Sequence, residues 1–197
     1  MRALVVTAHP CADSFAHAAA ERAVAGLEAA GHHVDTIDLA ASGFIAAMSL
    51  DERRAYHSDR PVIDPHVAEH VALIRAATIL VLVYPTWWSG LPAILKGWLE
   101  RTLVPGVGFR FDESTGKVRP GLTHIRRIVG VSTYGSPWFA VKIVNDNGRR
   151  TITRALRLSC GVRARTTWLG LYGMDTATPA DRIAFLARVE QRMARLT

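Results

Sequence analysis

Long apolar runs and cysteines are both scarce in this chain of 197 residues. The longest apolar runs, such as residues 79–84, are far shorter than the roughly 20 residues that a membrane-spanning helix needs. The chain also opens directly on a strand-like segment instead of a signal-peptide core, so we expect a cytoplasmic protein that is not embedded in a membrane. Cys11 and Cys160 are the only cysteines. Their separation fits neither a metal cluster nor a redox pair, which predicts free thiols and no metal site.

Linkers and repeats are also missing. No stretch rich in proline, glycine and serine is long enough to separate two domains, and 49% of the residues are hydrophobic, which is enough to build one core. We therefore expect a single domain over residues 1–197. The formal net charge of +7 would suit nucleic acid or an anionic ligand. Because the basic residues are spread along the sequence and form no single run, we predict no nucleic-acid partner.

Short apolar runs alternate with amphipathic stretches along the chain. Strands are predicted over residues 3–8, 33–39, 78–84, 126–133 and 162–171, and helices over residues 14–30, 65–77, 92–103, 147–159 and 179–196. The run TILVLVY at 78–84 has no polar alternation, which is typical of a strand buried on both faces of a parallel sheet. Strands that alternate with helices predict a three-layer α/β/α sandwich with right-handed crossovers.

Sheets of this kind bind ligands just beyond the carboxyl ends of their strands, so the loops that follow the strands are the candidate site. The first loop leads from His9 through Asp13 to Ser14 and Phe15 at a helix start. The free amides and partial positive charge of a helix amino terminus suit a phosphate group. The alternative is that Asp13 or Ser14 is an ordinary helix cap and that His9 only bonds the backbone at the strand end.

The second loop holds two adjacent tryptophans, Trp87 and Trp88, between Pro85 and Gly90. A short surface turn cannot bury both indoles in the core, so we expect a flat ligand there. An isoalloxazine ring fits such aromatic surfaces, with loop amides available for its polar edge. The alternative is a protein interface anchored by tryptophan, and both roles can hold together.

Residues 84–98 (YPTWWSGLPAILKGW) resemble the signature of the NAD(P)H:quinone oxidoreductase family with a flavodoxin-like fold. This family includes the quinone reductases, the drug-activity modulators and the ancillary oxidoreductases of potassium efflux systems. The opening AHPCADSF at 8–15 is similar to the family's segment at the same place. The resemblance implies a five-stranded parallel sheet of order 2-1-3-4-5. It also implies a flavin cofactor: FMN is favoured, because the chain lacks the carboxyl-terminal extension of larger FAD-binding relatives, and FAD is the alternative.

The resemblance also assigns site residues. It implies phosphate contacts at His9, Ser14 and Phe15, and ring contacts at Pro85, Thr86, Trp87, Trp88, Ser132, Thr133 and Gly135. The third loop, residues 132–138, has Tyr134 where the family has its first glycine, so Tyr134 joins Trp87 and Trp88 in the expected ring environment and narrows access to it. Larger members carry a tyrosine and a histidine where this chain has Ala140 and Asp146, so we predict no catalytic side chain.

Residues 105–122 are too long for a plain connection and have hairpin-like turn chemistry. We expect a flap or a dimer arm near the site. Phe109 and Phe111 then either roof the flavin of a partner subunit or pack the hairpin onto its own domain. The family resemblance implies a homodimer, formed through apolar helices such as 91–103, which carries Trp98.

The leading functional hypothesis is a flavin-dependent NAD(P)H:quinone oxidoreductase that works in two steps in one pocket. NAD(P)H gives a hydride to the flavin and leaves, and a quinone-like acceptor then takes its place and two electrons. Arg110, Arg119, Arg149 and Arg150 are candidates for the nicotinamide phosphates. The alternatives are a flavin-bearing regulatory subunit of a membrane transporter and a one-electron carrier of the flavodoxin type.

Overall fold

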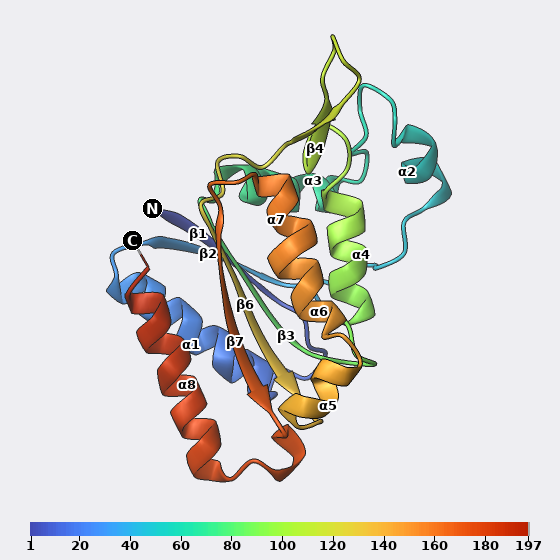
Figure 1. Ribbon diagram of the computed structural model, residues 1–197. Coiled ribbons are helices and arrows are strands. Elements are labelled where there is room, and N and C mark those ends of the chain that lie inside the picture. Colours follow the sequence, from blue (N-terminus) through green and yellow to red (C-terminus); the bar gives the residue numbers. More distant parts are fainter. Residues whose placement is uncertain (197) are drawn as a thin grey trace.

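The computed structural model describes residues 1–196 and is built around a sheet of five parallel strands (Figure 1). These strands are β1 (Arg2–Thr7), β2 (His33–Asp38), β3 (Ile79–Pro85), β6 (Arg127–Tyr134) and β7 (Arg165–Tyr172). They lie in the order β2-β1-β3-β6-β7. Counted within the sheet, this is the predicted order 2-1-3-4-5, so the expected sandwich with a central parallel sheet is confirmed.

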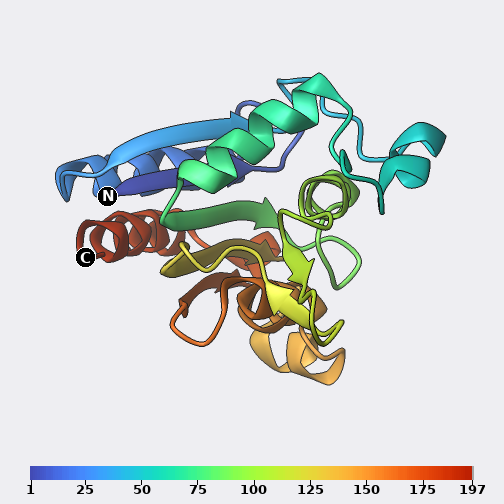
Figure 2. The same cartoon turned by 90° about the horizontal axis from the view of Figure 1, so that it is seen from above.

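Helices cover both faces of the sheet (Figures 1 and 2). One face carries α1 (Phe15–Ala29) and α8 (Pro179–Ala194), and the other carries α3 (Pro65–Ala76), α4 (Ala93–Thr102), α6 (Asn147–Arg150) and α7 (Arg157–Cys160). Gly26 lets α1 and α8 approach closely, because a Cβ there would lie 2.3 Å from the carbonyl oxygen of Glu190. Among the helices of residues 1–196, none is long and apolar enough to span a membrane.

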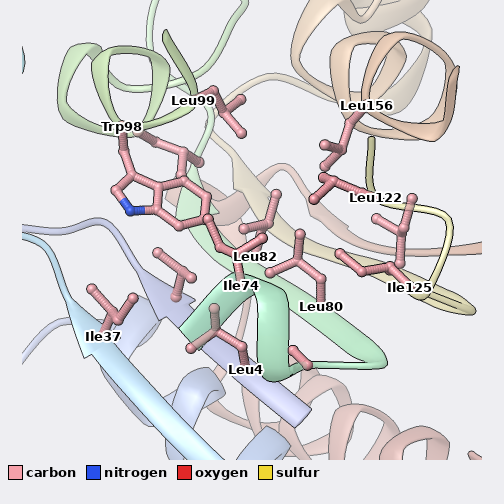
Figure 3. Close-up of a cluster of buried hydrophobic side chains, with 14 of the residues drawn as sticks. Leu4, Ile37, Ile74, Leu80, Leu82, Trp98, Leu99, Leu122, Ile125 and Leu156 are labelled. Atoms are coloured by element: carbon pink, nitrogen blue, oxygen red, sulfur yellow. The ribbon is translucent and has the colours of Figure 1, made fainter. Parts of the chain in front are cut away.

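Strand β3 is buried over its whole length and separates two apolar clusters, one on each face of the sheet. Figure 3 shows part of the larger cluster, in which Trp98 of α4 packs over Leu82 and Ile74. Trp98 is completely buried. It therefore belongs to the core of its own chain. A homodimer through other residues of this helix stays a prediction.

A short helix that the apolar pattern does not predict, α2 (Leu50–Ala55), lies in the irregular region after β2. It begins with a capping box, in which Ser49 and Glu52 bond each other's backbone amides. Glu52 also accepts a hydrogen bond of 2.8 Å from Arg101 of α4, and Arg101 donates a second one of 2.6 Å to Asp64. A buried ion cluster thus fastens this region to the helix that follows the tryptophan loop.

The chain between β6 and β7 is more helical than the sequence predicts. An additional helix, α5 (Trp138–Ile143), precedes α6, and a π-helical stretch over Thr151–Leu156 joins α6 to α7. Strand β7 begins three residues later than expected. The delay follows from a turn in which Gly161 has φ of 81° and accepts a hydrogen bond of 3.2 Å from the Ala164 amide.

The segment 105–122 forms the antiparallel hairpin of β4 (Phe109–Phe111) and β5 (Val118–Pro120). Figure 1 shows this hairpin at the end of the sheet where the strands begin, whereas α5 and the candidate loops lie at the opposite end. The hairpin therefore does not cover the loops of its own chain as a flap. Its role as a dimer arm stays a prediction.

Candidate functional site

The three predicted loops meet at the carboxyl edge of the sheet. The second and third loops are joined by a hydrogen bond of 2.9 Å between the Thr86 and Ser132 hydroxyls, and the Thr86 amide donates to the Thr133 carbonyl at 2.8 Å. The first loop reaches the second through the ring of His9, whose centroid is 5.6 Å from that of Trp87. Adjacent parallel strands end side by side, so residues far apart in the sequence form one surface.

The first loop ends at the amino terminus of α1. Ser14 is the cap of this helix, as the alternative interpretation proposes, and its Oγ accepts a hydrogen bond of 3.3 Å from the His17 amide. The first turn of α1 contains no acidic residue, so its partial positive charge is not neutralised there. The His17 side chain lies 2.9 Å from Ser14 Oγ and 2.8 Å from Asp38. Its pairing with Asp38, 21 residues away, leaves no signal in the sequence.

The second loop presents its two indoles to the outside. Trp87 is 45% exposed and Trp88 is fully exposed. Trp88 and Ser89 both have positive φ values, of 47° and 59°, although neither is a glycine. Left-handed backbone at such residues carries strain, which tends to be retained at ligand-binding sites. A large apolar surface held in this way next to a helix amino terminus suits a flat ligand that carries a phosphate.

Several predicted site residues have buried side chains and offer mainly their backbone to a ligand. These residues are Pro85, Ser132 and Tyr134. The Phe15 ring is only partly buried, but it lies 6.0 Å from the Phe185 ring on the core side of α1. The Tyr134 ring stacks on Tyr172 at 4.4 Å and points away from the loop surface. His9, Ser14, Thr86, Trp87, Trp88, Thr133 and Gly135 keep accessible surface at the edge of the sheet.

Behind the loops lies a buried polar group of Tyr84, Tyr134 and Asp146, of which the sequence assigns a role to Tyr134 alone. The Tyr134 hydroxyl donates a hydrogen bond of 2.9 Å to Asp146 Oδ1, and Asp146 adopts a left-handed conformation with φ of 47°. Burial, followed by the nearby Asp146 charge, raises the pKa of both Tyr134 and Tyr84, so both hydroxyls stay protonated. These tyrosines therefore act as neutral hydroxyls beside the carboxylate.

Close packing joins this polar group to the tryptophan loop. A Cβ on Gly148, at the start of α6, would lie 3.3 Å from the Gly90 carbonyl carbon and 3.3 Å from the Tyr84 hydroxyl. A side chain at this position would require the loop or the Tyr84 ring to shift by a few tenths of an ångström. The end of β6, the start of α6 and the tryptophan loop therefore form one packed unit.

The sheet order 2-1-3-4-5 defines a doubly wound α/β protein of the flavodoxin type. The helix start that suits a phosphate and the exposed aromatic rings lie at the carboxyl edge of this sheet, where such proteins bind their ligands. The family model described as "Flavodoxin-like fold" matches residues 1–194. The chain belongs to this family.

Individual relatives narrow the comparison. The chain is 30% identical over 152 residues to NAD(P)H dehydrogenase (quinone) 1 of Rattus norvegicus, an alignment that covers 68% of this chain and 54% of the rat protein. It is 35% identical over 66 residues to FMN-dependent NADH:quinone oxidoreductase 2 of Hahella chejuensis, covering 34% and 32% of the two chains. The alignments thus cover about half of the rat protein and about a third of the Hahella protein.

The similarity to a solved structure extends over both chains. The NAD(P)H:quinone oxidoreductase from Methanothermobacter marburgensis superimposes with a TM-score of 0.83 at 25% identity, and the superposition covers 100% of this chain and 99% of that one. The sheet, the flanking helices and the three loops therefore all lie within the shared architecture.

Proposed function

We propose that this protein is an FMN-dependent NAD(P)H:quinone oxidoreductase. The observation that carries the proposal is the exposed Trp87–Trp88 pair, held in a strained turn beside the amino terminus of α1. The full-length similarity to an archaeal NAD(P)H:quinone oxidoreductase and the sequence relationship to the rat and Hahella proteins support this activity. All three of these relatives are enzymes by name, which favours an enzyme over a transporter regulator or a one-electron carrier.

The described residues fit an FMN molecule. The phosphate is assigned to the first turn of α1, where the Phe15 amide, the Ser14 hydroxyl and His17 lie together and no carboxylate is present in the turn. The ring is assigned to the tryptophan loop and to the backbone of Thr133 and Gly135. FMN is preferred over FAD because the Hahella relative is FMN-dependent by name.

The chain's contribution to the reaction is to bind and orient the reactants. When bound, FMN would supply the two-electron chemistry that links NAD(P)H oxidation to reduction of the quinone, and two protons would complete the hydroquinone. Trp87 and Trp88 would provide a flat apolar wall on which the reactants stack. The Thr86–Ser132 hydrogen bond holds the third loop against the tryptophan loop, and the backbone amides of the third loop would be available to the polar edge of the ring.

A homodimer belongs to the same proposal. Besides Trp88, the side chains of Trp138, Phe139 and Ile143 on α5 are exposed at this end of the molecule. A second copy that covers them would exclude water from the site, and the hairpin of residues 105–122 is the candidate arm. A cytoplasmic location stays a prediction.

Isothermal titration of the flavin-free protein with FMN tests the proposed site. We expect saturable binding in the wild type and much weaker binding in a Trp87→Ala/Trp88→Ala variant. Ile183→Ala, which removes an exposed apolar side chain from α8, is the matched control and should bind FMN like the wild type. Equal FMN affinity of the double variant and the wild type would contradict the assignment of the ring to the tryptophan loop.

A further inference from the structure

The positive charge of the protein is concentrated in one part of the chain. The segment 138–172 contains seven of the 24 Lys and Arg residues and one of the 17 Asp and Glu residues. Its formal charge of +6 nearly equals the +7 of the whole chain. The basic residues recur along the helices without forming a run in the sequence. For this reason the sequence pattern alone did not reveal that they cluster. In the folded chain they lie on α5–α7, the connecting π-helix, the turn after α7 and the edge strand β7.

Five of these basic residues line one cavity between the helices and β7. The cavity has a volume of about 450 Å³, and we call it the basic pocket. Its cationic side chains are Lys142, Arg149, Arg150, Arg154 and Arg157. They come from successive helical turns and face Thr166 and Trp168 of β7. A π-helical stretch runs through the middle of this wall, and such stretches occur frequently at functional sites.

The basic pocket has almost no negative charge of its own. Within residues 1–196, Asp146 is the one acidic side chain that lines it, and Asp146 Oδ2 lies 3.9 Å from Arg149 Nη1. Arg157 donates hydrogen bonds to the backbone carbonyls of Ala164 and Val162, which fix the position of its side chain. These carbonyls carry no net charge and do not neutralise the guanidinium group. Like charges gathered in a concave wall repel one another, and a bound anion relieves that repulsion. Guanidinium groups match phosphate oxygens in pairs, which favours phosphate over a halide ion.

The end of the basic pocket that Lys142 and Asp146 line adjoins the candidate flavin site. Lys142 and Asp146 follow the third loop, and Gly148, between Asp146 and Arg149, packs against Gly90 of the tryptophan loop. Arg110 and Arg119, also candidates for a nicotinamide phosphate, lie on the hairpin at the other end of the sheet (Figure 1).

We propose that the basic pocket binds a small ligand that carries phosphate groups with at least two negative charges. Two sources offer this chemistry: the 2′-phosphate of NADPH, with the rest of the molecule reaching the tryptophan loop, and a free polyphosphate-type anion. The first source rests on the proposed function, whereas the second is independent of it.

Isothermal titration of the purified full-length protein with inorganic pyrophosphate tests the proposal, whether or not the protein carries flavin. We expect binding in the wild type and at least about tenfold weaker binding in an Arg150→Gln/Arg154→Gln variant, because hydrogen bonds between charged groups are lost. Arg195→Gln, on the other face of the sheet at the end of α8, is the control and should bind like the wild type. Lys142→Gln is a second variant in case the double variant does not fold.

The outcomes separate the proposal from the proposed function. Equal pyrophosphate affinity of the double variant and the wild type, or no binding at millimolar pyrophosphate, overturns the proposal. If the pocket serves NADPH, the double variant also raises the KM for NADPH about tenfold while the KM for NADH changes little. If it serves a free anion, pyrophosphate binding falls and both KM values stay at their wild-type level. A protein that binds pyrophosphate but shows no NAD(P)H oxidation refutes the proposed function and leaves the basic pocket standing.

Discussion

Replacement of Arg101 by methionine tests how strongly the buried ion cluster holds α4 to the region after β2. The Arg101 side chain is 5% exposed and that of its partner Glu52 is 8% exposed, whereas Asp64 is 36% exposed and contributes less. Removing one partner of a buried pair leaves an uncompensated charge, which costs about 3 to 5 kcal/mol. With a urea dependence of about 2 to 3 kcal/mol per molar, a loss of about 3 kcal/mol lowers the urea midpoint by roughly 1 to 1.5 M.

The loss should depend on pH. Burial by itself raises the pKa of Glu52, but hydrogen bonds from the Ser49 amide and from Arg101 outweigh burial and hold this pKa below its ordinary value. A lowered carboxyl pKa stabilises the fold above the unfolded-state pKa, and the contribution is lost as the pH falls through the folded-state value. Without Arg101, Glu52 takes up a proton more readily. The stability deficit of Arg101→Met should therefore be largest at pH 7 and smaller near pH 4.

Urea unfolding at both pH values, followed by tryptophan fluorescence, measures this deficit. Arg22→Met breaks the exposed pair with Glu190 and is the matched control, with an expected loss of about 1 kcal/mol or less. The reasoning is refuted if Arg101→Met unfolds at the same urea concentration as the control, or if its deficit is no smaller near pH 4 than at pH 7.

Three further predictions concern the site and its support. Trp88→Ala should weaken FMN binding about two- to tenfold, which is the value of a single aromatic stacking contact. The unfolding temperature should not change, since the indole is fully exposed. Isothermal titration and thermal unfolding measure the two quantities, and a large drop in unfolding temperature would argue for a structural role. Gly130→Ala should destabilise the fold by about 1 to 3 kcal/mol, because the new Cβ would lie 2.2 Å from Trp168 Cζ3. Gly90→Ala, whose Cβ meets its nearest atom at 3.9 Å, is the control in thermal unfolding, and equal unfolding temperatures for the two variants would contradict the packing argument. Tyr134→Phe removes the hydrogen-bond donor to buried Asp146 and should lower the free energy of unfolding in urea by about 1 to 3 kcal/mol. Tyr172→Phe keeps the stacked ring and should lower it less. Equal losses in the two variants would mean that the hydrogen bond to Asp146 contributes nothing.

The sheet could be predicted from the sequence because buried parallel strands leave a strong local signal. The run at 78–84 corresponds to β3, and the alternation of strands and helices gave the layers. The short helix α2 was missed because apolar periodicity does not detect six residues, although the Ser49–Glu52 capping box is visible in the sequence. The burial of Glu52 depends on Arg101, which is 49 residues away and leaves no local pattern.

The site was predicted in outline because the carboxyl ends of parallel strands converge, which places His9, Thr86 and Thr133 at one edge. The direction of individual side chains was not predictable in the same way. Tyr134 turns inward because Tyr172 and Asp146 receive its ring and hydroxyl. The hairpin lies far from the loops of its own chain because α4 runs from the tryptophan loop back to the other end of the sheet. A local turn signal in the sequence does not reveal this direction.

The most direct test of the proposed function is an absorbance spectrum of the purified protein, incubated with FMN if it is colourless and then mixed with NADPH and afterwards with a benzoquinone. We predict a flavin absorption band that bleaches on addition of NADPH and returns when the quinone is added, with FMN as the released cofactor identified by mass. A protein that remains colourless after incubation with FMN and after incubation with FAD would contradict the flavin site at Trp87 and Trp88 and favour a protein interface at this loop.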